Sequence, residues 1–281
     1  MHIDVADLRE FYARPLGAVV RRLVMGRIQA RWRRVPNGVL IGLGYAVPYL
    51  GAFKAQAAHC GAFMPSQQGA LVWPRDGLKQ SVLVNDEHLP LPDNSVDRML
   101  VVHGLETAER VQPFLREIWR TLTPEGRLMM VVPNRRGIWA RTDWTPFGFG
   151  RPYSRSQLEG MLKNAMFEPV DWAEALYVPP FSRNMLLRSA VAWERVGARI
   201  MPGFAGVIIV EAAKELVAPI AKPKKALVLP AIVPATPQLN RRTAGQGDQQ
   251  PESSDVGGKA NRSTNSDLRI KNRVSEPGGE V

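Results

Sequence analysis

The sequence has a single cysteine, Cys60, among its 281 residues. One thiol excludes a disulfide within the chain, and it cannot build a zinc cluster of the usual cysteine-rich kind. No uninterrupted apolar run reaches the length that a membrane helix needs. The first residues, MHIDVADLRE, lack the charged and then apolar pattern of a signal peptide. We therefore expect a cytoplasmic protein with no metal site and no membrane partner.

The sequence also lacks the aromatic pattern that accompanies nucleic-acid binding, although its formal net charge is +11. Residues 1–34 hold eight arginines against three acidic residues, and residues 220–281 hold ten basic residues against six acidic ones. The middle is nearly balanced. Basic ends of this kind are more often solvated surface than an RNA-binding device, so a nucleic-acid partner is not favoured.

The strongest pattern in the chain is a strand, a helix and a second strand. Val96–Val102 is a short apolar run of the kind that is buried on both faces in a parallel sheet. Residues 108–122 carry apolar side chains at three- and four-residue steps, which predicts an amphipathic helix, and Thr123 to Gly126 should end it in a turn. Residues 128–132 predict the next strand. Such a unit is a right-handed crossover between parallel neighbours.

Further elements are expected on both sides of this unit. Helical spacing between residues 4 and 32, broken near Pro15, predicts two N-terminal helices. Residues 38–48 predict a strand that runs into Gly42 and Gly44, followed by a helix over 49–58. Other strands are expected at 61–64, 81–84, 167–177 and 206–212, and other helices at 154–165 and 184–200. After residue 218 the composition predicts disorder.

Three phrases of the chain carry a family resemblance. They are LPLPDNSVD at 89–97, VHGLE at 102–106 and LREIWRTLTPEGRLMMVVPN at 115–134. In this order and spacing they resemble the second half of the class I S-adenosylmethionine-dependent methyltransferase domain, of the type-11 small-molecule kind. The resemblance implies an α/β fold: a Rossmann-like doubly wound sheet, mostly parallel, with one antiparallel edge hairpin. It also implies S-adenosyl-L-methionine as the cofactor.

The resemblance places the cofactor across the carboxyl ends of the first four strands. An acidic residue after the third strand accepts the adenine amino group in relatives. His103, after the fourth strand, is also the candidate general base, and a hydrogen-bonded structural histidine is the alternative. The cofactor contacts implied on this chain are Gly42, Gly44, Tyr45, Met64, Asp86, Glu87 and His103.

The chain departs from the family pattern at two positions. Leu40 stands where the first motif usually has an acidic residue that helps to hold the methionine amino group. Met64 stands where the second strand usually ends in a carboxylate for the ribose hydroxyls. The phrase GLGYAVPYL at 42–50 is similar to the first motif of a subgroup of these proteins, so the departure is expected to be a subgroup feature.

A long segment, residues 134–153, follows the fifth predicted strand and carries aromatic residues among arginines. Long ordered loops of this kind are often functional, and in the family this segment covers the substrate. Arginine there suits a carboxylate or phosphate on the substrate. Packing of the aromatic residues onto the domain is the equally open alternative. The substrate candidates are Arg135, Trp139, Arg151 and Tyr153.

These patterns predict three parts: an N-terminal helical cap (1–34), a methyltransferase domain (35–217) and a disordered basic tail (218–281). The expected function is methyl transfer from S-adenosylmethionine to a small-molecule acceptor. The transfer needs little beyond alignment of the nucleophile, methyl group and sulfur. Two alternatives remain: an inactive scaffold, favoured by the departures at Leu40 and Met64, and an RNA methyltransferase that uses Arg31, Arg33 and Arg34. The acceptor and the oligomeric state are not indicated.

Overall fold

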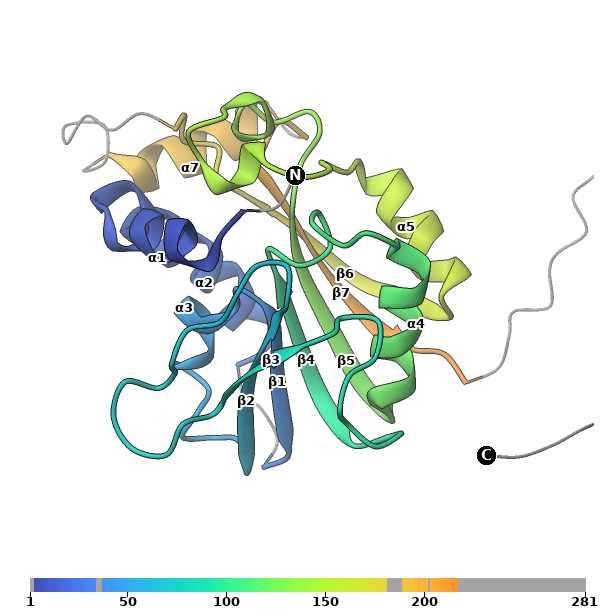
Figure 1. Cartoon of the computed structure of the whole chain (residues 1–281). Helices are drawn as coiled ribbons and strands as arrows, with labels where there is room; N and C mark the ends of the chain where they lie inside the picture. Colours follow the sequence, from blue (N-terminus) through green and yellow to red (C-terminus); the bar gives the residue numbers. More distant parts are fainter. Residues whose placement is uncertain (1–2, 34–36, 181–188, 202, 217–281) are drawn as a thin grey trace, which may run out of the picture. The chain divides into compact units, whose positions relative to one another are not determined.

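The computed structural model describes residues 3–33, 37–180, 189–201 and 203–216. Its centre is a seven-stranded sheet in the order β3-β2-β1-β4-β5-β7-β6 (Figure 1). The first five strands in this order pair in parallel, whereas β7 pairs antiparallel with both β5 and β6. The predicted doubly wound sheet with an antiparallel edge hairpin is therefore confirmed. The strands are β1 (Val39–Gly44), β2 (His59–Pro65), β3 (Ser81–Val84), β4 (Val96–Val102), β5 (Leu122–Pro133), β6 (Phe167–Ala175) and β7 (Val207–Lys214).

Helices cover both faces of the sheet (Figure 1). The apolar residues of α1, α2 and α3 belong to one buried cluster, and those of α4 and α5 belong to the cluster on the other face. Neither face of the central strands is therefore open to water. The helices are α1 (Val5–Ala13), α2 (Pro15–Arg31), α3 (Val47–Leu50), α4 (Val111–Thr121), α5 (Arg155–Asn164) and α7 (Ala190–Ile200), with short 3-10 turns η1 (Trp139–Arg141) and η2 (Pro146–Gly148).

Local sequence explains where several helices begin and which face they bury. The Asp4 carboxylate accepts a hydrogen bond from the Ala6 amide at the start of α1 (2.7 Å). Ser154 and Gln157 form a reciprocal capping box at the start of α5. In α4, Phe114 and Ile118 lie one turn apart and are fully buried. The predicted apolar face of α4 is therefore the face that packs on the sheet.

Two local predictions are wrong. The helix after β1 was expected over residues 49–58, but α3 ends at Leu50 and turns lead to β2. Residues 123–126, expected as a turn, lie inside β5, because Leu122 already pairs with Val96 of β4. The pairing of β4 with β5 shifts register between Val96 and Arg98, which accommodates the irregular segment. Long-range pairing thus overrides the local preference of Pro124 and Gly126.

Several predictions fall on residues outside the described ranges. These are the tail (218–281), Arg34 and positions 184–188 of the helix expected at 184–200. The division into three parts stays a prediction. Within the described ranges, no helix combines the length and the apolar character required to span a bilayer.

Candidate functional site

The carboxyl ends of β1 and β4 meet at the point where the strand order reverses, which is the usual ligand crevice of a doubly wound sheet. Gly44 ends β1 with φ of +81°, and a Cβ built there would lie 2.4 Å from the Val102 carbonyl oxygen. Only glycine is compatible with both constraints. The next amide, that of Tyr45, donates a hydrogen bond to the same Val102 oxygen (2.7 Å). The predicted glycine turn is present and is tied to the end of β4.

A buried polar chain begins on the β4 side of this crevice. His103 follows β4 with φ of +51° and is 1% exposed. Its Nδ1 lies 3.0 Å from Glu106 Oε1, and its Nε2 lies 3.0 Å from the hydroxyl of Tyr12 in α1. The Tyr12 hydroxyl also shares a hydrogen bond with the Tyr49 hydroxyl (3.2 Å). Both ring nitrogens of His103 are thus engaged, and the imidazole is held in one orientation.

A second side chain bridges the crevice from the β2 side. Gln68 is 2% exposed, and its amide nitrogen donates to the His103 carbonyl oxygen and to the Thr107 hydroxyl (2.9 Å to the hydroxyl). The backbone carbonyl oxygen of Gln68 accepts a hydrogen bond from the amide of Val5, the first residue of α1 (2.8 Å). Since β1 lies between β2 and β4, Gln68 links the loops on both sides of it. It also fixes the start of α1.

Helix α1 covers the bridged crevice with aromatic side chains. The Tyr12 ring centroid lies 5.6 Å from that of Tyr45, and Phe11 packs edge-on against Phe147 at 6.2 Å. Burial raises the pKa of Tyr12 well above its usual value and raises the pKa of Tyr45 to about 12. Burial also raises the pKa of Tyr49. The three hydroxyls therefore stay protonated at neutral pH and can act as hydrogen-bond donors.

The other cofactor residues implied by the resemblance lie around this crevice. Met64 is 1% exposed, and its sulfur accepts a hydrogen bond from the Leu71 amide (3.1 Å). Asp86 is buried after β3, whereas the neighbouring Glu87 pairs with Arg110. The structure thus gathers the predicted residues at one edge of the sheet. Met64 and Glu87 each contact another residue of the protein, Leu71 and Arg110 respectively.

The crevice as it stands does not accommodate S-adenosylmethionine. Tyr12, Gln68 and His103 are bonded across it, so an adenosine requires α1 or Gln68 to move. One group is left incompletely bonded: Glu106 Oε2 is buried and has no hydrogen-bond partner among the described residues. An unpaired carboxylate oxygen inside a protein is costly and is most often explained by a missing donor. Glu106 therefore marks the polar centre of this site.

The predicted substrate residues divide into two kinds. Trp139 and Tyr153 are buried, and each donates to a backbone oxygen: Trp139 to that of Val178 (2.8 Å) and Tyr153 to that of Leu105 (3.3 Å). Arg135 and Arg151 are exposed. The two aromatic residues fasten the loop to the domain, as the packing alternative expects. The substrate role of the four residues stays a prediction.

Two cavities lie where this loop meets α1. One, of about 410 Å³, is lined by Phe11, Arg14, Pro15, Leu16 and Trp144. A smaller one, of about 200 Å³, adjoins it and shares Phe11, Arg14 and Trp144. Trp144 is 53% exposed. The larger cavity is mainly apolar, whereas the smaller one is also lined by Asp7, Glu10 and Asp143. Both lie on α1 directly beside the residues that cover the crevice.

The comparison with protein families agrees with the resemblance. Residues 41–130 match the family model described as the methyltransferase domain. This segment contains β1 to β4 and most of β5, and therefore both sides of the crevice. The segment is similar to that family, and the chain has the class I methyltransferase fold. The recognition made from the three phrases is confirmed, whereas the subgroup of the GLGYA motif stays a prediction.

Sequence similarity to curated proteins is confined to a short segment. The ubiquinone/menaquinone biosynthesis C-methyltransferase UbiE of Rubrivivax gelatinosus is 38% identical over 63 residues. The match covers 22% of this chain and 25% of UbiE. The chain therefore matches about a quarter of the length of this relative.

Solved structures share the fold over most of the described chain. A SAM-dependent methyltransferase from Thermotoga maritima has a TM-score of 0.52 at 18% identity, covering 75% of this chain and 96% of its own. A methyltransferase of Haloferax volcanii, in complex with the activator Trm112, has a TM-score of 0.55 at 15% identity, covering 75% and 98%. Geranyl diphosphate C-methyltransferase from Streptomyces coelicolor, solved with S-adenosyl-L-homocysteine, has a TM-score of 0.50 at 12% identity, covering 68% and 74%. These similarities establish the fold.

Sequence reasoning missed the residues that close the crevice. Tyr12 falls within the helical spacing predicted between residues 4 and 32, and Gln68 lies beyond the second predicted strand, where no pattern indicated a role for it. Glu106 belongs to the VHGLE phrase, three residues after His103, where a carboxylate can reach the imidazole. That spacing was the available signal for Glu106. Nothing in the sequence indicated that Tyr12 and Gln68 would meet His103.

Proposed function

We propose that the protein is an S-adenosylmethionine-dependent methyltransferase that binds its cofactor at the crevice between β1 and β4. The observation that carries this proposal is the glycine turn at the strand-order reversal, within the segment that matches the methyltransferase domain model. Ligands of doubly wound folds bind at such a point. The presence of S-adenosyl-L-homocysteine in the Streptomyces coelicolor relative supports the same cofactor class.

Binding requires α1 to act as a lid. The closed crevice is held by the Tyr12–His103 bond and by the bond between Val5 and Gln68, both of which join α1 to the rest of the site. A ligand that binds only the open form has its apparent affinity reduced by the fraction of molecules that are open. Weakening these bonds should therefore strengthen cofactor binding.

Glu106 is the proposed replacement for the acidic residue missing at Leu40. Its Oε2 is a buried acceptor without a partner among the described residues, and it lies on the loop after β4. S-adenosylmethionine carries an ammonium group, which a buried carboxylate can hold through a charge-assisted hydrogen bond. His103 would then orient Glu106 through its Nδ1.

The acceptor is proposed to be a small molecule with an apolar body and an anionic or strongly polar group. The cavity lined by Phe11, Arg14 and Trp144 supports this class, because its other lining residues are apolar and the exposed Arg14 guanidinium, which pairs with Glu10, lies at its rim. It also lies on the lid, so lid movement and acceptor binding would be linked. An RNA acceptor is less supported: Arg31 pairs with Asp171 (2.9 Å) and donates to the Trp172 carbonyl oxygen (2.9 Å). Its guanidinium is thus already committed.

Calorimetric titration with S-adenosyl-L-homocysteine tests the proposal. We expect wild-type protein to bind, and Tyr12→Ala to bind roughly 10-fold or more tightly, because less free energy is needed to open the lid. Gln68→Ala keeps the backbone bond to Val5 but removes the side chain that crosses the crevice, so it should also bind more tightly. Leu162→Ala is the matched control: this residue is fully buried on α5, away from α1, so its loss destabilises the fold without releasing the lid. Equal affinities in all four proteins would contradict the lid, and no heat in any of them would contradict the cofactor.

A non-enzymatic scaffold is the second candidate, and the closed crevice is the observation that favours it. In that case the Tyr12–His103–Glu106 chain is purely structural. An assay for transfer of labelled methyl groups from S-adenosylmethionine to small molecules of a cell extract distinguishes the enzyme from the scaffold. Transfer by wild-type protein, lost in Glu106→Gln, supports the enzyme. Absence of both ligand binding and transfer supports the scaffold.

A further inference from the structure

Helix α7 buries its acidic residue and leaves apolar side chains exposed. Its one acidic residue, Glu194, is 6% exposed, whereas three of its large apolar side chains face water. Trp193 is 44% exposed, Val196 50% and Ile200 70%. These three residues are spaced by three and four positions, so they share one side of the helix. Two further apolar residues just beyond its end, Met201 and Phe204, are 49% and 53% exposed.

The inward side of α7 explains why the helix holds this orientation. The Glu194 carboxylate accepts hydrogen bonds from the amides of Leu176 (3.1 Å) and Tyr177 (2.9 Å). Gly197 lies against the Tyr177 side chain, where an added Cβ would come within 2.5 Å of it. The orientation is therefore fixed by specific contacts. The apolar stripe (Trp193, Val196, Ile200, Met201 and Phe204) is left outside by the same contacts.

Two exposed arginines lie on α7 next to the stripe. Arg195 and Arg199 are the exposed charged residues of α7, and no exposed acidic residue lies on it. Between α7 and α2, a cavity of about 550 Å³ is lined by Arg22, Arg27 and Arg195, among others. The acidic residue in its lining is Glu194, whose oxygens are already bonded. The α7 residues of this cavity, Glu194, Arg195 and Ala198, lie on the side of the helix away from Trp193 and Ile200. Helix α7 thus carries its apolar stripe and its exposed arginines on different, adjoining sides.

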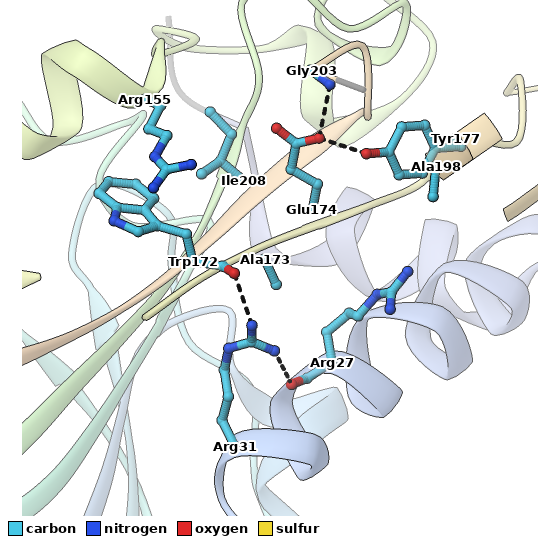
Figure 2. Close-up of a pocket in the computed structure, with 10 residues that line it drawn as sticks. All are labelled: Arg27, Arg31, Arg155, Trp172, Ala173, Glu174, Tyr177, Ala198, Gly203 and Ile208. Atoms are coloured by element: carbon cyan, nitrogen blue, oxygen red, sulfur yellow. Dashed lines mark hydrogen bonds between the residues drawn. The ribbon is translucent and has the colours of Figure 1, made fainter. Parts of the chain in front are cut away.

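A second cavity continues this basic surface along the edge strand β6 (Figure 2). It has a volume of about 580 Å³ and shares Arg27, Arg31 and Ala198 with the first. Arg155 adds a third guanidinium, which stacks over the Trp172 ring at 4.8 Å. Its acidic residue, Glu174, accepts from the Tyr177 hydroxyl (2.5 Å) and the Gly203 amide (3.0 Å). Two of these guanidiniums already pair with carboxylates, Arg27 with Glu194 (3.6 Å) and Arg31 with Asp171 (2.9 Å). Arg155 is exposed and stacks on Trp172.

We propose that the apolar stripe of α7 and the arginines beside it form a surface that docks onto an anionic lipid bilayer. A helix with apolar residues including tryptophan on one side and arginines on its flank lies in a membrane interface, with the apolar side in the acyl boundary. Exposed apolar patches rimmed by charge mark interaction sites. The charge selects the partner, because the exposed charged residues of α7 are arginines, the chain carries +11 and lipid surfaces are anionic. This inference does not rest on the proposed methyl transfer.

Vesicle flotation of the full chain tests the docking surface. We expect wild-type protein to float with vesicles of phosphatidylcholine containing about one third phosphatidylglycerol, and much less with phosphatidylcholine alone. The double variant Trp193→Ser with Ile200→Ser should partition roughly 10-fold or more weakly. The double variant Arg195→Gln with Arg199→Gln should lose a similar factor on anionic vesicles only. All four positions are exposed, so the fold should be retained, which circular dichroism checks.

Matched controls carry the same changes elsewhere. Leu78→Ser replaces an apolar residue that is 86% exposed far along the chain from α7, and Arg116→Gln replaces an exposed arginine of α4. Both should float as wild-type does. The proposal is overturned if wild-type protein does not float with anionic vesicles, or if the α7 variants float equally well. It is also overturned if light scattering shows a dimer in the absence of lipid that the Trp193→Ser and Ile200→Ser changes dissociate, since a second copy then covers the stripe.

Discussion

The crevice beneath α1 and the basic edge beside α7 differ in how far their side chains are buried and bonded. At the crevice, Tyr12, Gln68 and His103 are buried, and Tyr12 and Gln68 are each hydrogen-bonded to His103. At the β6 edge, arginines line open cavities and the apolar side chains of α7 lie in water. Apart from Glu106 Oε2, the polar groups described at the expected active site are hydrogen-bonded within the protein, whereas the apolar stripe of α7 is exposed to water. Substitutions at the crevice should therefore change the free energy of unfolding more than substitutions on the apolar stripe of α7.

The largest expected effect tests whether the crevice is structural. Gly44→Ala should lower the free energy of unfolding by about 3 kcal/mol or more, because φ of +81° disfavours a side chain and the Cβ meets the Val102 oxygen. Chemical denaturation measures the loss. Gly160→Ala in α5, where nothing lies within 4 Å of the added Cβ, should instead gain about 0.5–1 kcal/mol. Similar values for both would break the comparison.

Alkaline pH should destabilise the crevice next. The chain has five tyrosines, and in all of them, Tyr12, Tyr45, Tyr49, Tyr153 and Tyr177, burial raises the pKa. A raised native pKa means that the stabilisation is complete below the unfolded value, near 10, and is lost as pH rises through the native value. For Tyr45 the native pKa is about 12.

Absorbance of the phenolate checks this prediction. In native protein the phenols should ionise only above pH 10, together with unfolding, whereas in concentrated urea they should ionise near their ordinary pKa of about 10. Tyr45→Phe should lose less stability than wild-type protein between pH 10 and 12. A native protein that titrates all five phenols near 10 without unfolding would show that the crevice is open.

A smaller effect should follow from removing one hydroxyl. Tyr12→Phe should cost about 1–2 kcal/mol, because His103 Nε2 and the Tyr49 hydroxyl both lose a buried partner. Tyr153→Phe is the control, since its hydroxyl makes one long bond to a backbone oxygen (3.3 Å), and it should cost less. Thermal unfolding followed by circular dichroism compares the two. An equal or larger loss of stability for Tyr153→Phe would contradict the claim that the Tyr12 hydroxyl of α1 stabilises the closed crevice.

The smallest effect is expected at the far edge. Ile200→Ser should change the free energy of unfolding by no more than about 0.5 kcal/mol, because this side chain is 70% exposed. Ile209→Ser in β7 introduces the same chemical change at a fully buried position and should cost about 3 kcal/mol or more. Denaturant midpoints measure both. A large loss for Ile200→Ser would mean that the apolar stripe is already covered within the protein.

The fold could be predicted far more fully than the site. Val96–Val102 appears with its predicted bounds as β4, and Ser154 caps α5 as expected, because hydrophobic periodicity and capping are local properties of the chain. The course of β5 could not be predicted locally, since Leu122 joins the strand only by pairing with Val96. At the site, the sequence indicated the Gly44 turn and the position of His103. It did not indicate that both nitrogens of His103 are occupied.

The sequence by itself determined the order of strands and helices, the glycine turn and the methyltransferase resemblance, because each depends on residues close together in the chain. The tertiary structure decided that Tyr12 and Gln68 close the crevice, 91 and 35 residues from His103. It also decided which side of α7 meets water, since the bonds from Glu194 to Leu176 and Tyr177 orient that helix. Apolar periodicity predicts that a helix has an apolar side. Contacts with residues elsewhere in the chain, here the hydrogen bonds of Glu194 and the packing of Gly197 on Tyr177, decide whether that side is buried.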